Sequence, residues 1–275
     1  MDNNSNGNGN GNSNRYDLKA DENREDALRK IRTAGSLSIS PELFEKIYLS
    51  PKSRVHGDLR SIVGNPTPLG LFGFLISLTP LTCELMGWRG AGGGGAALIG
   101  VFYCMGGLLM PIAGILEFIL GNTFPFVVFA SFGAFWLATA ITLTPFYNAA
   151  AAYDPSNPAN PGFHTSYAYF YVFMGLLCLI YLICGIRTNI VFEIIFLTLT
   201  IAFGLLAGAY WQQANLNTAL SNNLQIAGGA VLFVTCLAGW YLFFVQMLAS
   251  VDFPYTLPVG DLSRVVKGRR EREEA

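Results

Sequence analysis

The sequence predicts an all-α membrane protein whose transmembrane domain is a bundle of six helices. The mean hydropathy is positive, at +0.41, and charged residues make up 13% of the chain, about half the share usual in soluble globular proteins. Six apolar segments are each long enough to cross a hydrocarbon core of roughly 30 Å. A soluble protein with buried core helices is disfavoured, because these segments leave no polar face for water. A segment that crosses lipid must satisfy its own backbone hydrogen bonds, so each is expected to be a helix.

The spans are expected in this order, with ends uncertain by a few residues: Pro68–Trp88, Gly95–Leu116, Phe124–Leu143, Ala168–Ile186, Ile190–Gln212 and Leu224–Leu248.

The basic residues predict how the chain is oriented. Of 17 Lys and Arg, ten precede Gly64 and five follow Ala249, which leaves Arg89 and Arg187 between them. With six spans both termini share one side, and the side richer in Lys and Arg is the cytoplasmic one. We therefore expect a multi-pass protein with both termini in the cytoplasm. The membrane is expected to be the plasma membrane.

Composition divides the chain into four regions. Residues 1–14 form an Asn/Gly/Ser tract that is expected to be disordered, and residues 15–63 form a charged cytoplasmic region. The six-helix domain spans residues 64–250, and residues 251–275 form a cytoplasmic tail.

The residue types needed for catalysis or metal binding do not occur at recognisable spacings. The five cysteines all fall within apolar spans and are expected to be reduced packing residues. The two histidines have no partner at a metal-ligand or catalytic spacing, and no phosphate-binding loop is present. We expect no enzyme activity, no metal, no cofactor and no nucleic-acid partner.

The first span opens with "GNPTPLGLFGF", residues 64–74. Thr67 followed by Pro68 predicts a helix start, with the threonine hydroxyl as cap and the proline in the first turn. Gly70 and Gly73 remove side chains from one face, so that another backbone or a small solute can approach. Two interpretations remain open: a helix cap with glycine packing, or the entrance to a solute path.

The third and fifth spans open with similar residues, Asn122 and Thr123 in "GNTF" and Asn189 in "TNIVF". Counting inward from the three asparagines, a bulky apolar side chain follows after nine or ten residues. At 1.5 Å per residue these side chains lie about 15 Å from their helix starts, near the middle of the bilayer. The three residues are Phe74, Phe132 and Leu199.

This arrangement predicts a polar vestibule at the cytoplasmic end that leads to a hydrophobic constriction. Helix N-termini carry partial positive charge and free N–H donors, so the vestibule favours a small anion. Since the spans contain no Lys or Arg, binding is expected to be weak enough for the solute to leave again.

The same residues carry a family resemblance. "NPTPLGL" resembles the signature NPxPLGL of the acetate uptake transporter family, which includes bacterial succinate–acetate permeases and fungal acetate and ammonia-export proteins. The stretch "GGLLMPIAGILEFILGNTFPFVVFASFGAFW" is similar to the second and third spans of that family. The resemblance covers roughly residues 60–260. It implies six spans, a homo-hexamer with a path in each protomer, and movement of acetate or a similar small monocarboxylate, often with a proton.

The resemblance also implies roles for particular residues. The narrowest point of the family corresponds to Phe74, Phe132 and Leu199, and the acid at the end of the second span to Glu117. The first-span motif maps to Asn65, Pro66, Pro68, Leu69 and Gly70.

Three acidic residues in or near the spans are candidate proton carriers, because carboxylates in such settings tend to titrate upward. For Glu117 a coupling role and a structural role are both open. Glu84 and Glu193 are interpreted as interfacial side chains that reach water.

The chain also departs from the family. Phe132 stands where relatives commonly have tyrosine, Met110 where they often have glutamine, and Ile119 and Leu120 where they commonly have basic residues. An alternative function is therefore that of a diverged member without acetate uptake, with a role in ammonia export, signalling or membrane organisation.

Overall fold

A computed structural model of the chain describes residues 63–153, 156 and 160–262, which all lie in one compact unit. The expected disordered tract, the charged region up to residue 62 and the last thirteen residues lie outside the described part. Within the described part the secondary structure is helical apart from one isolated antiparallel bridge between Asn189 and Asp261.

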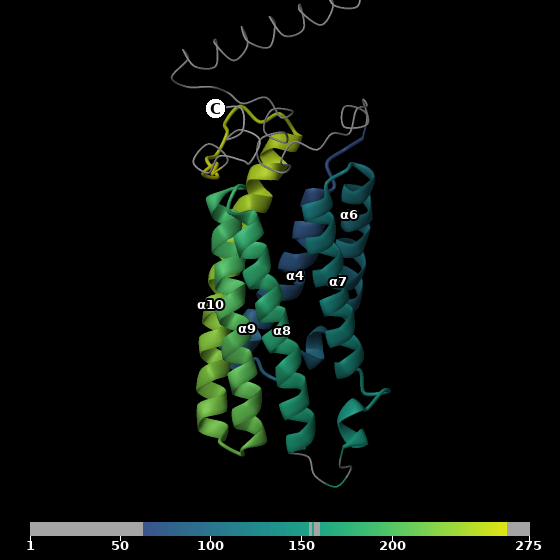
Figure 1. Cartoon of the computed structure of the whole chain (residues 1–275), viewed down its shortest axis with the longest axis vertical. Coiled ribbons are helices and arrows are strands. Elements are labelled where there is room, and N and C mark those ends of the chain that lie inside the picture. Colours follow the sequence, from purple (N-terminus) through teal and green to yellow (C-terminus); the bar gives the residue numbers. More distant parts are fainter. Residues whose placement is uncertain (1–62, 154–155, 157–159, 263–275) are drawn as a thin grey trace, which may run out of the picture. The chain divides into compact units, whose positions relative to one another are not determined.

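Six helical segments are long and apolar enough to cross a membrane, which confirms the predicted fold class. The main helices, labelled in Figure 1, are α4 (Thr67–Leu85), α6 (Gly107–Ile119), α7 (Thr123–Leu143), α8 (Pro161–Gly185), α9 (Ile190–Ala214) and α10 (Thr218–Ser250). The shorter elements are η1 (Trp88–Gly90), η2 (Ala96–Leu98), α5 (Ile99–Val101), η3 (Phe102–Gly106) and η4 (Ala149–Ala152).

Asparagine side chains cap three of the main helices. The Oδ1 atoms of Asn160, Asn189 and Asn217 each accept a hydrogen bond from the backbone N–H three residues further on, at the starts of α8, α9 and α10. Such a bond satisfies one of the free donors of a helix start. Two of these helices begin six or seven residues before the predicted spans, because hydropathy marks the lipid-facing part of a helix and the cap marks its first turn.

The helices form two groups, visible in Figure 1. In one group α9 packs between α8 and α10, and in the other α4, α6 and α7 pack together with η3. The α4–α10 contact joins the groups on one side, where Gly239 lies against Leu75.

On the other side of the bundle, α7 contacts α8 and α9 through aromatic rings and not through a close approach of the helix backbones. Phe135 of α7 meets Tyr171 of α8 at a centroid distance of 6.5 Å and Phe203 of α9 at 5.5 Å. Phe124 of α7 meets Tyr181 of α8 at 5.9 Å. We call this ring-filled space between α7, α8 and α9 the aromatic seam.

The helices alternate in direction, so α4, α7 and α9 begin at one end of the bundle, which we call the proximal end. Gly121 makes the tight turn from α6 into α7 there, with a φ of 77°, a left-handed conformation that glycine adopts without strain. The opposite end, where α8 and α10 begin, is the distal end.

Candidate functional site

The side chains of Phe74 and Phe132 meet at the centre of the bundle. Their ring centroids are 6.0 Å apart and the rings are inclined at 70°, an edge-to-face contact between α4 and α7. Both are buried, and Leu199 of α9 belongs to the same buried cluster. The structure thus brings the three residues that the helix offsets single out into one core.

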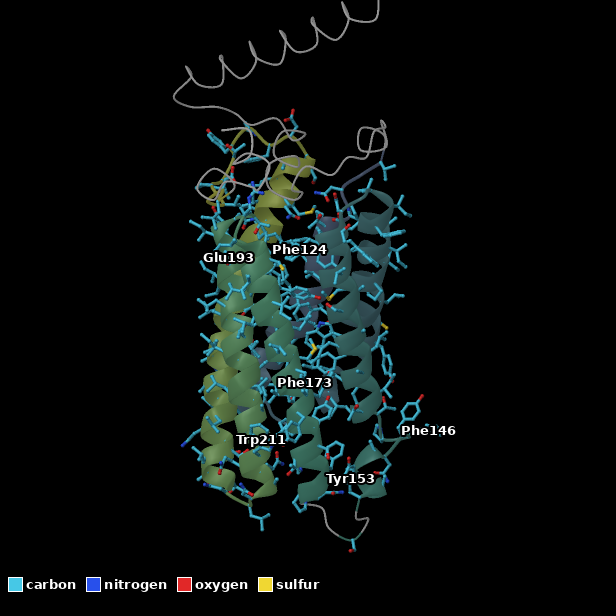
Figure 2. The ribbon with its side chains drawn as sticks, viewed as in Figure 1. Phe124, Phe146, Tyr153, Phe173, Glu193 and Trp211 are labelled. Atoms are coloured by element: carbon cyan, nitrogen blue, oxygen red, sulfur yellow. The ribbon has the colours of Figure 1, made fainter. Side chains whose placement is uncertain are left out.

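The turns of α9 before and after Leu199 make contacts that show how deep Leu199 lies in the bundle. Phe196, one turn before it, meets Phe124 of α7 at 6.1 Å, and Phe203, one turn after it, meets Phe135 at 5.5 Å. Figure 2 shows Phe124 near the proximal end of this seam. Leu199 therefore lies level with the stretch of α7 between these two rings, the stretch that carries Phe132.

A tyrosine hydroxyl lies beside this point although Phe132 has none. The Tyr181 ring of α8 is 6.4 Å from the Phe132 ring, and its hydroxyl is 2.9 Å from Ser131 Oγ. No offset from a helix-start asparagine predicts this pair, since Tyr181 lies near the end of α8, far from its Asn160 cap. The sequence feature that could have predicted this pair is a serine and a tyrosine within otherwise apolar segments.

At the proximal end, Glu117 joins the starts of two helices. Thr67 Oγ1 donates a hydrogen bond to Glu117 Oε1, and Asn122 Nδ2 donates to Glu117 Oε2 at 2.5 Å. The Glu117 and Thr67 side chains are 0% and 1% exposed, so these bonds are shielded from water. The fully buried carboxylate thus ties the end of α6 to the starts of α4 and α7.

The predicted capping role of Thr67 is wrong. Pro66 occupies the N-cap position of α4, no side chain caps the helix, and the Thr67 hydroxyl is bound to Glu117. Asn65 Oδ1 accepts the Thr67 N–H at 2.9 Å instead. The Thr67 hydroxyl thus binds the carboxyl group of Glu117 and not a free N–H group of its own helix.

The other residues of the opening motif lie around the start of α4. Pro66 and Gly70 are buried, while Pro68 and Leu69 are partly exposed. A Cβ on Gly70 would come within 2.6 Å of the Phe129 ring, so this glycine packs against Phe129 and does not border an open space. A Cβ on Gly73 would likewise lie 2.7 Å from the carbonyl oxygen of Met105, the close backbone approach expected from the sequence.

The three asparagines at the proximal helix starts have different contacts. Asn65 accepts from a local N–H, Asn122 donates to Glu117, and Asn189 caps α9 through the Phe192 N–H at 3.0 Å. Asn189 also pairs with Asp261, so the segment after α10 returns to the start of α9. Thr123, the first residue of α7, is exposed in the single chain.

The two other acidic residues differ from each other. Glu84 is only 8% exposed, and its Oε1 accepts the Gly95 N–H at 2.5 Å. That its side chain reaches water stays a prediction. Glu193 lies in the first turn of α9, at the opposite end of the helix from Trp211, as Figure 2 shows. Its side chain is partly exposed, although Oε1 itself is buried.

Tyrosines continue the aromatic seam toward the distal end. The Tyr210 ring of α9 is 5.4 Å from Tyr167 and 5.2 Å from Tyr171 of α8, and 5.7 Å from the His164 ring. Hydroxyls thus follow the apolar centre of the bundle on its distal side.

Metal ligation finds no support among residues 63–153, 156 and 160–262, where no group of three His, Cys, Asp or Glu side chains is placed to hold an ion. All five cysteines are free thiols.

Comparison with known proteins adds a second line of evidence. The sequence profile of the GPR1/FUN34/yaaH family matches residues 50–264. The chain is 49% identical to the protein alcS of Aspergillus fumigatus over 256 residues, which is 90% of this chain and 94% of alcS. It is 32% identical to the acetate transporter protein patA of Aspergillus clavatus, over 76% of this chain and 83% of that protein.

A solved structure is similar as well. The bacterial acetate channel SatP superposes with a TM-score of 0.56 at 25% sequence identity, covering 72% of this chain and 99% of the channel. The six membrane-spanning helices and these similarities confirm the resemblance that "NPTPLGL" predicts.

Proposed function

Because the chain belongs to the GPR1/FUN34/yaaH family, we propose that it moves small monocarboxylates such as acetate across a membrane, along a path inside each protomer. The path starts at the proximal end, near Asn65, Asn122 and Thr123, passes the constriction of Phe74, Phe132 and Leu199, and leaves along the distal tyrosines. The observation that carries this proposal is the edge-to-face contact of Phe74 and Phe132 at the centre of the bundle.

The chemistry of the constriction favours a small solute whose charge is weak or balanced by a proton. A carboxylate crossing an apolar ring contact loses hydration, and an isolated charge in such surroundings is costly. The Tyr181 and Ser131 hydroxyls lie beside the contact and can offer hydrogen bonds there. We propose that acetate passes this point in company with a proton, which neutralises it.

Glu117 has two candidate roles within this proposal. Its hydrogen bonds to Thr67 and Asn122 support a structural role, in which the carboxylate holds the helix starts at the mouth of the path. Its complete burial beside the mouth supports a role in proton coupling. We favour the structural role, because both carboxylate oxygens accept hydrogen bonds.

In the membrane we place the proximal end at the cytoplasmic side of the plasma membrane, with both termini in the cytoplasm. The distribution of Lys and Arg supports this orientation. Assembly as a hexamer follows from the resemblance to acetate uptake transporters, and large apolar side chains on the outer helix faces, such as Phe118 and Phe173, suit contact with lipid or neighbouring protomers.

Ammonia export is the second candidate. The chain is 31% identical to the ammonia transport outward protein 3 of Saccharomyces cerevisiae, over 67% of this chain and 63% of that protein. A seam of rings and hydroxyls without a Lys or Arg side chain also suits a small neutral solute.

The test is uptake into lipid vesicles that contain the purified protein. Labelled acetate should enter vesicles with protein faster than empty vesicles, and an inward proton gradient should accelerate it. Release of ammonia at equal protein content, without acetate entry, would favour the second candidate and contradict the first.

A further inference from the structure

One turn beyond the constriction, two buried polar side chains from different helices lie close to the same glycine, Gly106. Ser77 follows Phe74 by three residues on α4, and Trp136 follows Phe132 by four residues on α7. At 1.5 Å per residue both lie about 5 Å deeper, on the distal side of the ring contact.

Both side chains are completely enclosed. Ser77 is 0% and Trp136 is 1% exposed. Neither Ser77 Oγ nor Trp136 Nε1 has a hydrogen-bond partner within the described part of the chain. Leaving a buried donor unpaired is destabilising, so such a group calls for an explanation.

The two groups converge on one glycine. A Cβ placed on Gly106 would lie 2.4 Å from the five-membered ring of Trp136 and 2.8 Å from Ser77 Oγ. Gly106 ends η3, a single π-helical turn between α5 and α6. Turns of this kind occur frequently at functional sites. A side chain at position 106 would collide with both, so only glycine lets the serine and the indole pack this close to the backbone of η3.

Neighbouring rings hold the indole in a defined position. Phe102 stacks on Trp136 at 4.9 Å with an interplanar angle of 27°, and Phe135 meets it edge-on at 5.3 Å. The indole N–H is therefore a fixed donor.

We infer that Ser77 and Trp136 form a hydrogen-bonding station that receives the carboxyl group of the solute directly after it passes Phe74 and Phe132. The inference rests on the proposed function. An indole N–H only donates, whereas a serine hydroxyl can donate or accept, so together they fit the carbonyl oxygen and the second oxygen of a carboxyl group, with or without its proton. The surrounding Phe102 and Phe135 rings suit a short alkyl group.

The station also explains how the solute leaves again. Its donors are neutral, so it replaces part of the lost hydration without holding an anion as tightly as Lys or Arg would. The ligand class is accordingly a carboxylate with a very short chain.

The experiment uses the full-length protein in mild detergent, labelled with 5-fluorotryptophan. The chain has four tryptophans, and Trp136→Phe identifies the ¹⁹F signal of Trp136 while preserving the ring stack on Phe102. Trp240 is the matched control, because its Nε1 already donates to Thr79 Oγ1 at 3.0 Å. Sodium acetate is titrated against sodium chloride at equal ionic strength, and acetate flux into vesicles is measured on the same preparations.

The inference expects a saturable shift of the Trp136 signal with acetate, and none of the Trp240 signal. Ser77→Ala should weaken this titration about fivefold to tenfold, the loss of one hydrogen bond, and Trp136→Phe should raise the half-saturating acetate concentration for flux by a similar factor. Trp240→Phe should leave flux unchanged.

Acetate flux and the ¹⁹F signal of Trp136 test the proposed function and the station separately. If the wild type transports acetate while its Trp136 signal is unmoved, the station is wrong and the proposed function stands. If the signal responds without transport, the station stands and the proposed function fails. If neither is seen, both are wrong.

Discussion

Thr67 at the start of α4 and Glu117 near the end of α6 are fifty residues apart in sequence, and the threonine hydroxyl donates a hydrogen bond to the buried carboxylate. Asn122 donates to the other carboxylate oxygen. The two motifs that open the first and third spans are thus held together by one acidic side chain, which defines the proximal end of the proposed path.

Glu117→Gln should loosen this junction. The glutamine keeps one acceptor oxygen for Asn122, but its NH₂ group faces the Thr67 hydroxyl, which must then accept instead of donate. We expect a loss of about 1–3 kcal/mol in unfolding free energy. Thermal unfolding of the purified protein checks this. Glu193→Gln serves as control, because the Glu193 side chain is partly exposed, and it should unfold near the wild-type temperature. An unaltered melting temperature for Glu117→Gln, together with loss of proton-driven uptake, would favour the coupling role instead.

Asn65→Ala separates the two interpretations of "GNPTPLG". The variant loses the hydrogen bond from the Thr67 N–H, worth about 1 kcal/mol. If the Asn65 amide also orients the solute, flux per protomer should fall well below what this small loss explains, with assembly intact. Thr67→Ser keeps the hydroxyl for Glu117 and should leave flux nearly unchanged. Normal flux in Asn65→Ala would make the motif purely structural.

Tyr181→Phe removes the hydroxyl beside the constriction while keeping the ring packed against Phe124 and Phe132. We expect acetate flux to fall about fivefold, as for a lost interaction of about 1 kcal/mol. Phe132→Tyr should raise flux, and in the Tyr181→Phe background it should restore part of the loss. A double variant no better than Tyr181→Phe alone would show that a hydroxyl at this depth is irrelevant.

Cysteine labelling tests the orientation. In a variant without native cysteines, single cysteines at Ser5 and Glu274 should be protected from a membrane-impermeant reagent in intact cells. One at Ser156, which is exposed in the loop before α8, should react. Reaction at either terminal position would overturn the cytoplasmic placement of the ends.

Much of the fold was predictable, because each span is a local property of its own residues. Phe74 lies nine residues after Asn65 and Phe132 lies ten after Asn122, and since the rise of a helix is constant, such similar offsets place the side chains at similar depth. The start of α8 at Pro161 was missed because its first residues are too polar to register as a span, while Asn160 caps the helix beyond the apolar window.

The side-chain contacts of the site were harder to predict. The bond between Thr67 and Glu117 depends on how α4 meets α6, which no pattern within either segment encodes. Trp136 could have been singled out from the sequence, because tryptophan in a membrane protein is typical of the interface and this one is in the middle of its span. In the structure it is 1% exposed.

The most direct test of the central claim is the size profile of transport through the Phe74 variants. Rates of formate, acetate, propionate and butyrate entry are measured in vesicles with equal amounts of intact oligomer. Phe74→Ala should admit the longer acids relative to acetate, and Phe74→Leu, which costs less packing, should do so to a smaller extent. Phe72→Ala is the control, since Phe72 pairs with Phe243 of α10 at 6.3 Å, away from the Phe132 contact, and it should keep the wild-type profile. The same size profile in Phe74→Ala as in the wild type would contradict a solute path that passes between Phe74 and Phe132.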